Sequence, residues 1–209
     1  FDEKINPNYF FSFGEYWNDA IKFKSRKINI GFPYMELVEN NLSKNIIKEN
    51  NSILVISKGK FQRNFFIKIT NEILNSLQGF KIYYKLNPSE YNNWKKNYPV
   101  SFQTSPNLEI IDNNDKPLNY FYKKANYLIG SGSTCIYEGV VNNMTVFVIK
   151  SLYYSDAKKL IDNNYLFLVS NANEILSKIK NGETPSNKID KEYMFKTGSY
   201  DNIEKNVQK

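Results

Sequence analysis

A glycine-rich turn late in the chain carries the groups best suited to bind an anion. An apolar run over residues 127–129 predicts a buried strand, and the turn after it opens a helix at Ser133 or Thr134. Such a helix start presents unpaired backbone N–H groups, the positive end of the helix dipole and two hydroxyls to one point. The pattern predicts a phosphate site made by Gly130, Ser131, Gly132, Ser133 and Thr134. The alternative is a capped helix after a core strand, with the glycines only shaping the turn.

Glu138 follows about one helical turn beyond Thr134, on the same face of the predicted helix. A carboxylate there could accept hydrogen bonds from sugar or ribose hydroxyls. The turn resembles the dinucleotide-binding fingerprint only superficially, because the third glycine is missing and the turn follows a late strand. The sequence therefore argues against a nicotinamide cofactor.

A second basic turn, Ser57-Lys58-Gly59-Lys60, follows an earlier apolar run. Lys58 and Gly59 suit contact with a phosphate or a sugar carboxylate. The turn is not a P-loop, because the second glycine and the Lys-Ser/Thr ending are missing. The alternative is a basic turn on the surface.

Two later turns could add polar contacts to the same site. Lys85 and Asn87 end the next predicted strand, where Pro88 imposes a turn. Asp112 follows the strand after that, in the polar turn 111–115. Each of these turns also reads as an ordinary strand exit.

The elements that position these turns alternate from about residue 52 onward. Short strands alternating with helices imply right-handed crossovers and a parallel sheet covered on both faces. We therefore expect an α/β, doubly wound, Rossmann-like domain that binds its ligand beyond the carboxyl ends of the strands, at the switch point. Strands are expected over 52–57, 80–85, 108–111, 127–129, 145–149 and 166–169, and helices over 61–77, 90–96, 118–124, 155–163 and 172–180.

The two ends of the chain lack this alternation. Strand-like runs at 9–13 and 27–31 flank a helical pattern over 15–21. We interpret residues 1–35 as the end of a preceding N-terminal domain, an interdomain connection or an extra βαβ element, and 39–51 as a polar linker or surface helix. Residues 181–209 are polar and predict a loop with a peripheral helix over 200–207.

Composition excludes several chemistries. The chain of 209 residues has no histidine and one cysteine, which removes His-based zinc ligation, Ser-His-Asp and Cys-His catalysis, and a thiolate metal site. We therefore expect no metal site. The net charge of +7 is scattered among acids, which favours a phosphate-rich ligand or an anionic membrane surface over a nucleic-acid track. No apolar run approaches the roughly 20 residues that span a bilayer.

The turns in this order resemble the C-terminal half of bacterial capsule and lipopolysaccharide glycosyltransferases, which have the two-domain GT-B fold. The resemblance covers about residues 7–170, and 7–17 with 31–34 are similar to the stretch that joins the two halves. Bacterial sialyltransferases hold a cytidine nucleotide donor with a His-Pro motif and a Ser/Thr motif. Pro88 matches the first and Ser133 with Thr134 the second, while Asn87 stands in place of the His. An amide can donate a hydrogen bond to phosphate, but it carries no charge and cannot protonate a leaving group. The similar segments are 84–91, 110–113, 127–139 and 145–149.

This resemblance implies that residues 36–180 bind a CMP- or UDP-linked sugar donor, in an inverting, metal-independent glycosyltransferase that makes a bacterial surface polysaccharide. It implies a glycan or glycolipid acceptor, and a catalytic base in the N-terminal half of a parent protein. No catalytic residue is assigned in this chain, which we expect to be inactive alone. A cytoplasmic location follows, with peripheral contact to the inner face of the membrane.

Two alternatives remain beside the transferase. One is a nucleotide-sugar epimerase-like domain, against which the lack of histidine and of an acid pair near the turn argues. The other is a degenerate, non-catalytic α/β scaffold or polysaccharide-binding module, which Asn87 favours.

Overall fold

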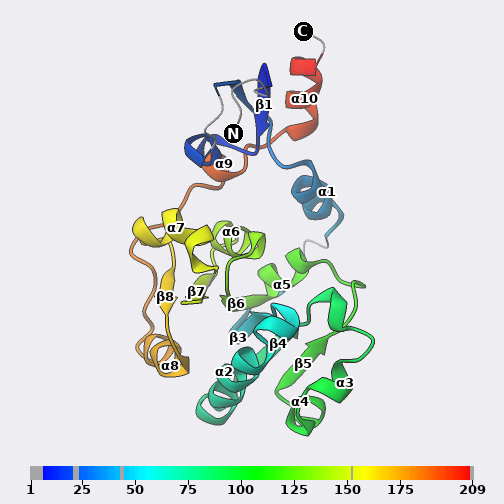
Figure 1. The fold of residues 1–209 in the computed structure, drawn as a ribbon, viewed down its shortest axis with the longest axis vertical. Coiled ribbons are helices and arrows are strands. Elements are labelled where there is room, and N and C mark those ends of the chain that lie inside the picture. The colour runs from blue at the N-terminus through cyan, green and yellow to red at the C-terminus, as the bar shows by residue number, and fades with distance from the viewer. Residues whose placement is uncertain (1–6, 21–23, 43–44, 152, 208–209) are drawn as a thin grey trace. The chain divides into compact units, whose positions relative to one another are not determined.

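The computed structural model describes residues 7–20, 24–42, 45–151 and 153–207. The chain divides into two compact units, residues 1–43 with 189–209, and residues 44–188 (Figure 1). Among the described residues, no helix is both long enough and apolar enough to cross a membrane.

The larger unit is built on one parallel sheet. In chain order the strands are β3 (Glu49–Ile56), β4 (Lys81–Lys85), β5 (Leu108–Ile111), β6 (Ala125–Gly130), β7 (Thr145–Ile149) and β8 (Phe167–Val169). The six described strands lie in the order β5-β4-β3-β6-β7-β8, and every neighbouring pair is parallel. The chain thus builds outward from β3 to β5, returns to place β6 beside β3, and builds outward again to β8. This is the strand order of a doubly wound, Rossmann-like sheet.

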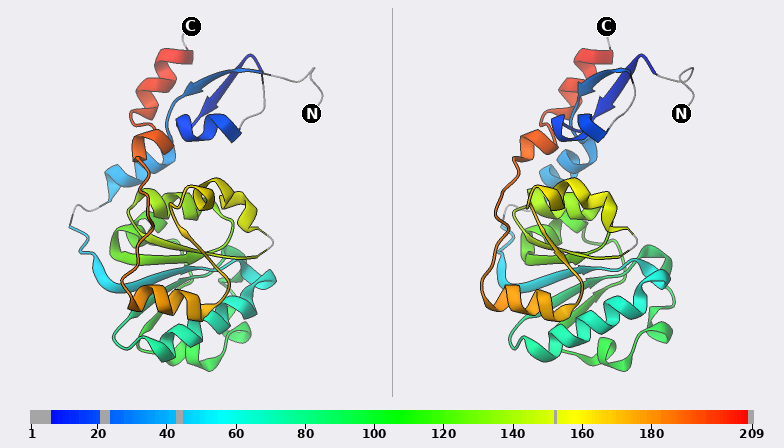
Figure 2. Two further views of the ribbon diagram at one scale, coloured as in Figure 1. Left: turned by 90° about the vertical axis from the view of Figure 1, so that its left-hand side faces the viewer. Right: turned by 60° about the vertical axis from the view of Figure 1, so that its left-hand side comes forward.

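Helices cover both faces of this sheet. The helices of the larger unit are α2 (Arg63–Ser76), α3 (Trp94–Asn97), α4 (Val100–Thr104), α5 (Leu118–Lys124), α6 (Thr134–Val141), α7 (Lys158–Asp162) and α8 (Ala172–Lys180), with 3₁₀ helices η3 (Gly59–Phe61), η4 (Pro88–Glu90) and η5 (Tyr154–Ala157). Figure 2 shows α2 and α8 on one face of the sheet, and α6 and α7 on the other. The fold-class prediction is confirmed.

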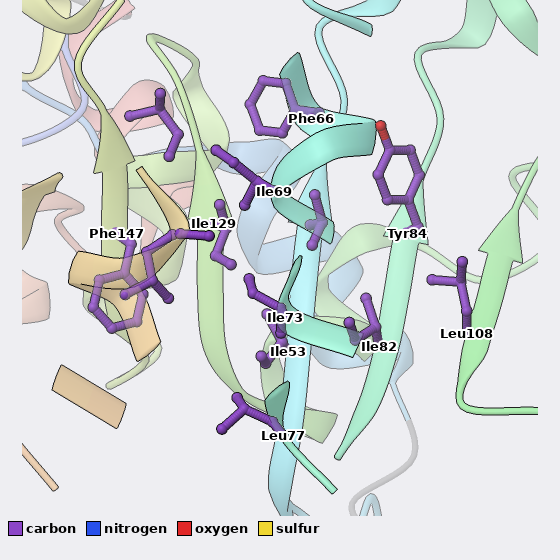
Figure 3. Close-up of a cluster of buried hydrophobic side chains, with 14 of the residues drawn as sticks. Ile53, Phe66, Ile69, Ile73, Leu77, Ile82, Tyr84, Leu108, Ile129 and Phe147 are labelled. Atoms are coloured by element: carbon purple, nitrogen blue, oxygen red, sulfur yellow. The ribbon is translucent and has the colours of Figure 1, made fainter. Parts of the chain in front are cut away.

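The core of the larger unit follows from the two-residue period of the strands. Ile53 and Val55 of β3 point to the face covered by α2, where Phe66 and Ile73 are fully buried (Figure 3). On the other face, α6 lies so close to the sheet that a methyl group on Gly139 would come within 2.4 Å of a Leu128 methyl. Each buried aliphatic side chain contributes about 1.5–3 kcal/mol relative to exposure, so this alternation holds the sheet and its helices together.

The smaller unit joins the two ends of the chain. Its elements are β1 (Tyr9–Ser12), η2 (Glu15–Ala20), β2 (Arg26–Asn29), α1 (Pro33–Asn41), α9 (Lys191–Met194) and α10 (Ser199–Val207). β1 and β2 are parallel. The Trp17 indole donates a hydrogen bond to the Met194 carbonyl at 2.8 Å, and the Ser199 N–H and hydroxyl donate to the Glu36 carboxylate at 2.8–3.0 Å. The helix predicted over 200–207 is therefore present and anchored at its start.

Several boundaries differ from the sequence prediction. β3 begins at Glu49, three residues early, because Glu49 already pairs with Ala125 of β6. α1 occupies part of the predicted linker, with Pro33 in its first turn, a position that proline favours. α4 was not predicted, because its five residues are too few to show a helical period. The predicted end of the first helical pattern, Ile21, lies outside the described residues.

Candidate functional site

The candidate site lies where β3 and β6 end side by side. These strands are neighbours, but the chain leaves β3 towards β4 and leaves β6 towards β7. The turns that follow them diverge at this switch point, where doubly wound sheets bind ligands. Lys58 and Gly59 follow β3, while Gly130 ends β6, residues 131–133 form the second turn and Thr134 opens α6.

The turn after β6 opens α6 with a side-chain cap. Ser133 has extended backbone angles, and its hydroxyl accepts a hydrogen bond from the Cys135 N–H at 3.4 Å. Its carbonyl accepts from the Ile136 N–H at 3.1 Å. Thr134 is exposed, and among the described residues its N–H has no hydrogen-bond partner. This start of α6 therefore keeps one N–H and one hydroxyl available for an anion.

The two glycines of this turn are required by close packing. Neither has a positive φ. A methyl group on Gly132 would lie 2.1 Å from the Tyr153 carbonyl oxygen, and one on Gly130 would lie 2.9 Å from the Ile136 side chain. The loop after β7 thus rests directly on the turn after β6. Tyr153 itself is half exposed at this edge of the sheet.

Ser131 is committed to an internal contact. Its side chain is buried, and its hydroxyl donates to the Gln62 side-chain oxygen at 2.7 Å. This bond connects the turn after β6 to Gln62, the residue that precedes α2. Ser131 therefore supports the shape of the turn through an internal contact.

Lys58 connects the two turns of the switch point. Its ammonium donates to the Gly132 carbonyl oxygen and lies 5.6 Å from the centre of the Tyr153 ring. Gly59 has φ +69°, and a methyl group on it would lie 3.3 Å from the Asn87 β-carbon, so the two residues lie close together. The structure therefore brings Lys58, Gly59 and Asn87 together with the turn after β6.

Asn87 caps the short helix η4. Its side-chain oxygen accepts from the Ser89 N–H at 3.1 Å and from the Ser89 hydroxyl at 2.7 Å, while Pro88 fills the first position of the helix. The amide nitrogen of Asn87 has no hydrogen-bond partner in the described part of the chain. It can therefore donate to a ligand.

Lys85 makes hydrogen bonds to the turn after β5, and Asp112 makes one to Trp94. The Lys85 ammonium donates to the Asn113 carbonyl and, at 3.1 Å, to the Asn114 side chain, both in the turn after β5. The Asp112 carboxylate accepts from the indole nitrogen of Trp94 at 2.8 Å. These contacts agree with the alternative interpretation of both residues, in which each belongs to an ordinary turn at the end of a strand.

Glu138 lies on α6, beside Tyr122 of α5. Burial raises the pKa of its carboxyl group from 4.5 to about 7, and the neighbouring Tyr122 hydroxyl opposes the shift in part. Tyr122 is fully buried, and its hydroxyl has no partner at good hydrogen-bond geometry among the described residues. Burial also raises the pKa of the Cys135 thiol. Glu138 is therefore poised between its neutral and ionised forms near neutral pH.

Sequence reasoning missed a buried polar cluster beneath the turn after β3. It consists of Ser57, Arg63, Glu90 and Tyr98. Glu90 follows the Asn-Pro turn, and Arg63 is one of two arginines in the chain. The rarity of arginine was the only signal of this cluster in the sequence, because the fold alone brings the four residues together.

The fold of this chain is shared with GT-B glycosyltransferases and UDP-GlcNAc 2-epimerases. The sequence matches no protein-family model and no curated protein. The UDP-GlcNAc 2-epimerase of Methanocaldococcus jannaschii, in complex with UDP-GlcNAc and UDP, is 12% identical with a TM-score of 0.67, over 96% of this chain and 60% of that one.

Two further structures extend this likeness. The Neisseria meningitidis UDP-GlcNAc 2-epimerase bound to UDP-GlcNAc is 15% identical with a TM-score of 0.59, over 84% of this chain and 49% of that one. A glycosyltransferase from Rickettsia africae ESF-5 is 17% identical with a TM-score of 0.53, over 76% of this chain and 46% of that one. The chain therefore spans between 46% and 60% of these proteins.

Proposed function

We propose that the unit of residues 44–188 is the nucleotide-sugar donor-binding domain of a glycosyltransferase. The observation that carries the proposal is the meeting of a cationic turn and a capped helix start at the switch point, through the Lys58 contact to Gly132. The fold shared with proteins solved with UDP and UDP-GlcNAc supports a nucleotide sugar as the ligand.

The polar groups of the site suit different parts of such a donor. Thr134, with the first turn of α6, would hold the phosphates, and Lys58 would neutralise their charge. Asn87 would donate its amide N–H to phosphate or base, and Glu138 would accept from the ribose hydroxyls. Catalysis would be electrostatic, with these hydrogen-bond donors and the Lys58 charge placed where negative charge would grow on the leaving nucleotide.

The rest of the reaction belongs to the parent protein in this proposal. An N-terminal half would supply the acceptor site and the catalytic base, and the acceptor would be a glycan or glycolipid of a bacterial surface polysaccharide. The donor would be CMP- or UDP-linked, and the basic surface would suit peripheral contact with an anionic membrane. This chain alone would bind nucleotide weakly and turn nothing over.

A nucleotide-sugar epimerase domain is the second candidate. It is favoured by the higher TM-scores of the two epimerases, 0.67 and 0.59 against 0.53 for the transferase. This chain matches only 60% and 49% of the two epimerases, so incubation of the parent protein with UDP-GlcNAc, followed by NMR of the sugar ring, separates the candidates. The C2 epimer would appear only with an epimerase, whereas a donor domain would leave the sugar unchanged.

Calorimetric titration with CMP, CDP, UDP and GDP in turn tests the first proposal. Saturable binding of one nucleotide would support it and name the donor class. Ser133→Ala with Thr134→Ala should then weaken that binding at least about tenfold, since the lost Thr134 hydrogen bond to a charged group costs about 1.5 kcal/mol or more and the Ser133 cap is lost as well. Ser101→Ala with Thr104→Ala, two exposed positions on α4, is the matched control. Unaltered affinity in the first variant would overturn the site assignment.

A further inference from the structure

The Glu90 carboxylate is a buried hub that none of the proposed ligand contacts uses. The residue is 4% exposed. One oxygen accepts from the Arg63 guanidinium at 2.6 Å, and the other accepts from the Tyr98 hydroxyl at 3.1 Å and lies 3.4 Å from the Ser57 hydroxyl. Ser57 and Arg63, 33 and 27 positions earlier in the chain, and Tyr98, eight positions later, therefore meet on one carboxylate.

Through Ser57, this hub reaches the backbone of the turn after β3. The Ser57 hydroxyl accepts from the Gly59 N–H at 3.2 Å, which fixes the turn at the residue whose φ is +69°. The same hydroxyl has one hydrogen to donate, and the Glu90 carboxylate is positioned to accept it. The shape of the turn that carries Lys58 is thus linked to the charge on Glu90.

The turn after β4 holds the turn after β3 at a second point. Asn87 caps the 3₁₀ helix η4 and Glu90 is its last residue. Asn87 lies so near Gly59 that a methyl group on Gly59 would come within 3.3 Å of the Asn87 β-carbon. This three-residue helix therefore contacts the turn after β3 at both ends, at Asn87 and at Glu90. We call this arrangement the clasp. The clasp consists of Asn87, Glu90, Ser57 and Gly59.

Burying a carboxylate is costly, so packing alone does not explain this arrangement. An apolar residue of similar size fills a buried space at less cost than an ion pair does. A carboxylate with charge-assisted hydrogen bonds instead imposes a defined geometry on its partners. Preorganised geometry is what a phosphate site needs, because donors that are already fixed do not lose freedom when the ligand binds.

We propose that Glu90 is a positioning residue that holds the turn after β3 in the shape required for Lys58 and Gly59 to meet the phosphates of the ligand. Glu90 acts through Ser57 and Arg63 and does not touch the ligand. This inference rests on the proposed function for its ligand, but the clasp itself can be tested without one.

Hydrogen exchange of the whole chain measures the clasp directly. Glu90→Gln replaces one acceptor oxygen by a donor of nearly the same size, and should speed exchange of the amides of residues 57–62 about tenfold, with β4 and α2 unchanged. Tyr98→Phe removes one of the three donors and should have a smaller effect. Ser57→Ala cuts the link while the Glu90–Arg63 pair remains, so it reports even if Glu90→Gln fails to fold.

The matched control is Glu109→Gln, which removes the same charge from an exposed pair with Lys81 at 3.7 Å. Calorimetry with UDP and with CMP gives the second readout. Glu90→Gln should lower the affinity for whichever nucleotide the unsubstituted chain binds by about fivefold, since loss of preorganisation lowers affinity without removing a ligand contact. The control should alter neither readout.

Two results would overturn the inference. Unchanged exchange over 57–62 in both Glu90→Gln and Ser57→Ala would show that no clasp exists. Faster exchange with full nucleotide affinity would show that this turn does not form the ligand site. If the unchanged chain binds neither nucleotide, the proposed function fails together with the role towards ligand, and the exchange result alone decides whether Glu90 holds the turn.

Discussion

The Lys58 ammonium donates a hydrogen bond to the Gly132 carbonyl and so connects two turns that are 74 residues apart in sequence. These turns follow β3 and β6, the central neighbours of the sheet. The cation is thereby held beside the start of α6, where the helix dipole and a free N–H favour an anion. A phosphate that binds there competes with the Gly132 carbonyl for Lys58.

We expect Lys58→Met to weaken nucleotide binding about tenfold or more, since a hydrogen bond to a charged group is worth about 1.5–3 kcal/mol. Lys85→Met is the matched control, because the Lys85 ammonium is held by Asn113 and Asn114 in the turn after β5. Calorimetric titration of both variants checks the contrast. Equal losses in the two variants would mean that only the general positive charge of the surface matters.

Gly132→Ala should destabilise the larger unit by about 2 kcal/mol, the usual cost of forcing extra atoms into a packed site. The added methyl group would lie 2.1 Å from the Tyr153 carbonyl, so the loop after β7 must move. Gly79→Ala is the comparison, because its loss of stability would have a different cause. The added methyl group meets no atom within 4 Å, but the φ of Gly79 is +75°. That variant should cost about 1 kcal/mol from backbone strain alone.

Urea unfolding measures both losses, and hydrogen exchange separates their origins. Faster exchange over 153–157 is expected for Gly132→Ala and not for Gly79→Ala. If Gly132→Ala leaves this loop protected, the contact between the two turns is not maintained in solution.

Glu138 should make stability fall as pH rises from 4.5 to about 7. Its pKa is about 7 in the folded chain and 4.5 as the reference value, so between these pH values the folded state binds more protons than the unfolded state. The free energy of unfolding should therefore decrease between pH 4.5 and 7, by no more than about 3 kcal/mol. Urea unfolding at pH 5 and pH 8 checks this, and Glu138→Gln should remove this part of the slope.

Nucleotide binding should depend on pH with the opposite sign. The ionised carboxylate accepts hydrogen bonds from ribose hydroxyls, so affinity should rise as pH passes 7. The phosphates of the ligand titrate in a similar range, and Glu138→Gln measured under the same conditions corrects for them. An identical pH profile in the two proteins would remove Glu138 from the site.

Asp112→Ala should destabilise the chain while leaving nucleotide affinity unchanged. The substitution leaves the indole N–H of the buried Trp94 without its acceptor, at a cost of about 1–3 kcal/mol. Asp115→Ala, in the exposed part of the same turn, is the control and should cost little. A loss of nucleotide affinity larger than that of the control would show that Asp112 belongs to the ligand site.

The strands and helices with strong local patterns could be predicted from sequence alone. The segments Leu118–Lys124, Thr145–Ile149 and Ala172–Lys180 form with the predicted bounds. The last of these has apolar residues at helical spacing and an Asn171 side chain that caps its first turn. Alternation of such segments was enough to predict the parallel sheet and the edge where its turns converge.

The identity of the partners in that edge could not be predicted. Lys58 follows β3 and Lys85 ends its neighbour β4, yet one reaches the turn after β6 and the other the turn after β5. Gly132 looked like a turn residue, but it is fixed by the loop around Tyr153, 21 positions later.

The sequence by itself determined the doubly wound fold and the choice of turns, because hydrophobic period and turn residues act over a few positions along the chain. Only the tertiary structure decided which polar groups remain available. Burial set the pKa of Glu138, and long-range hydrogen bonds engaged Ser131, Lys85 and Asp112 while leaving Thr134 open. Those effects depend on distances between segments far apart in the chain, which no local pattern encodes.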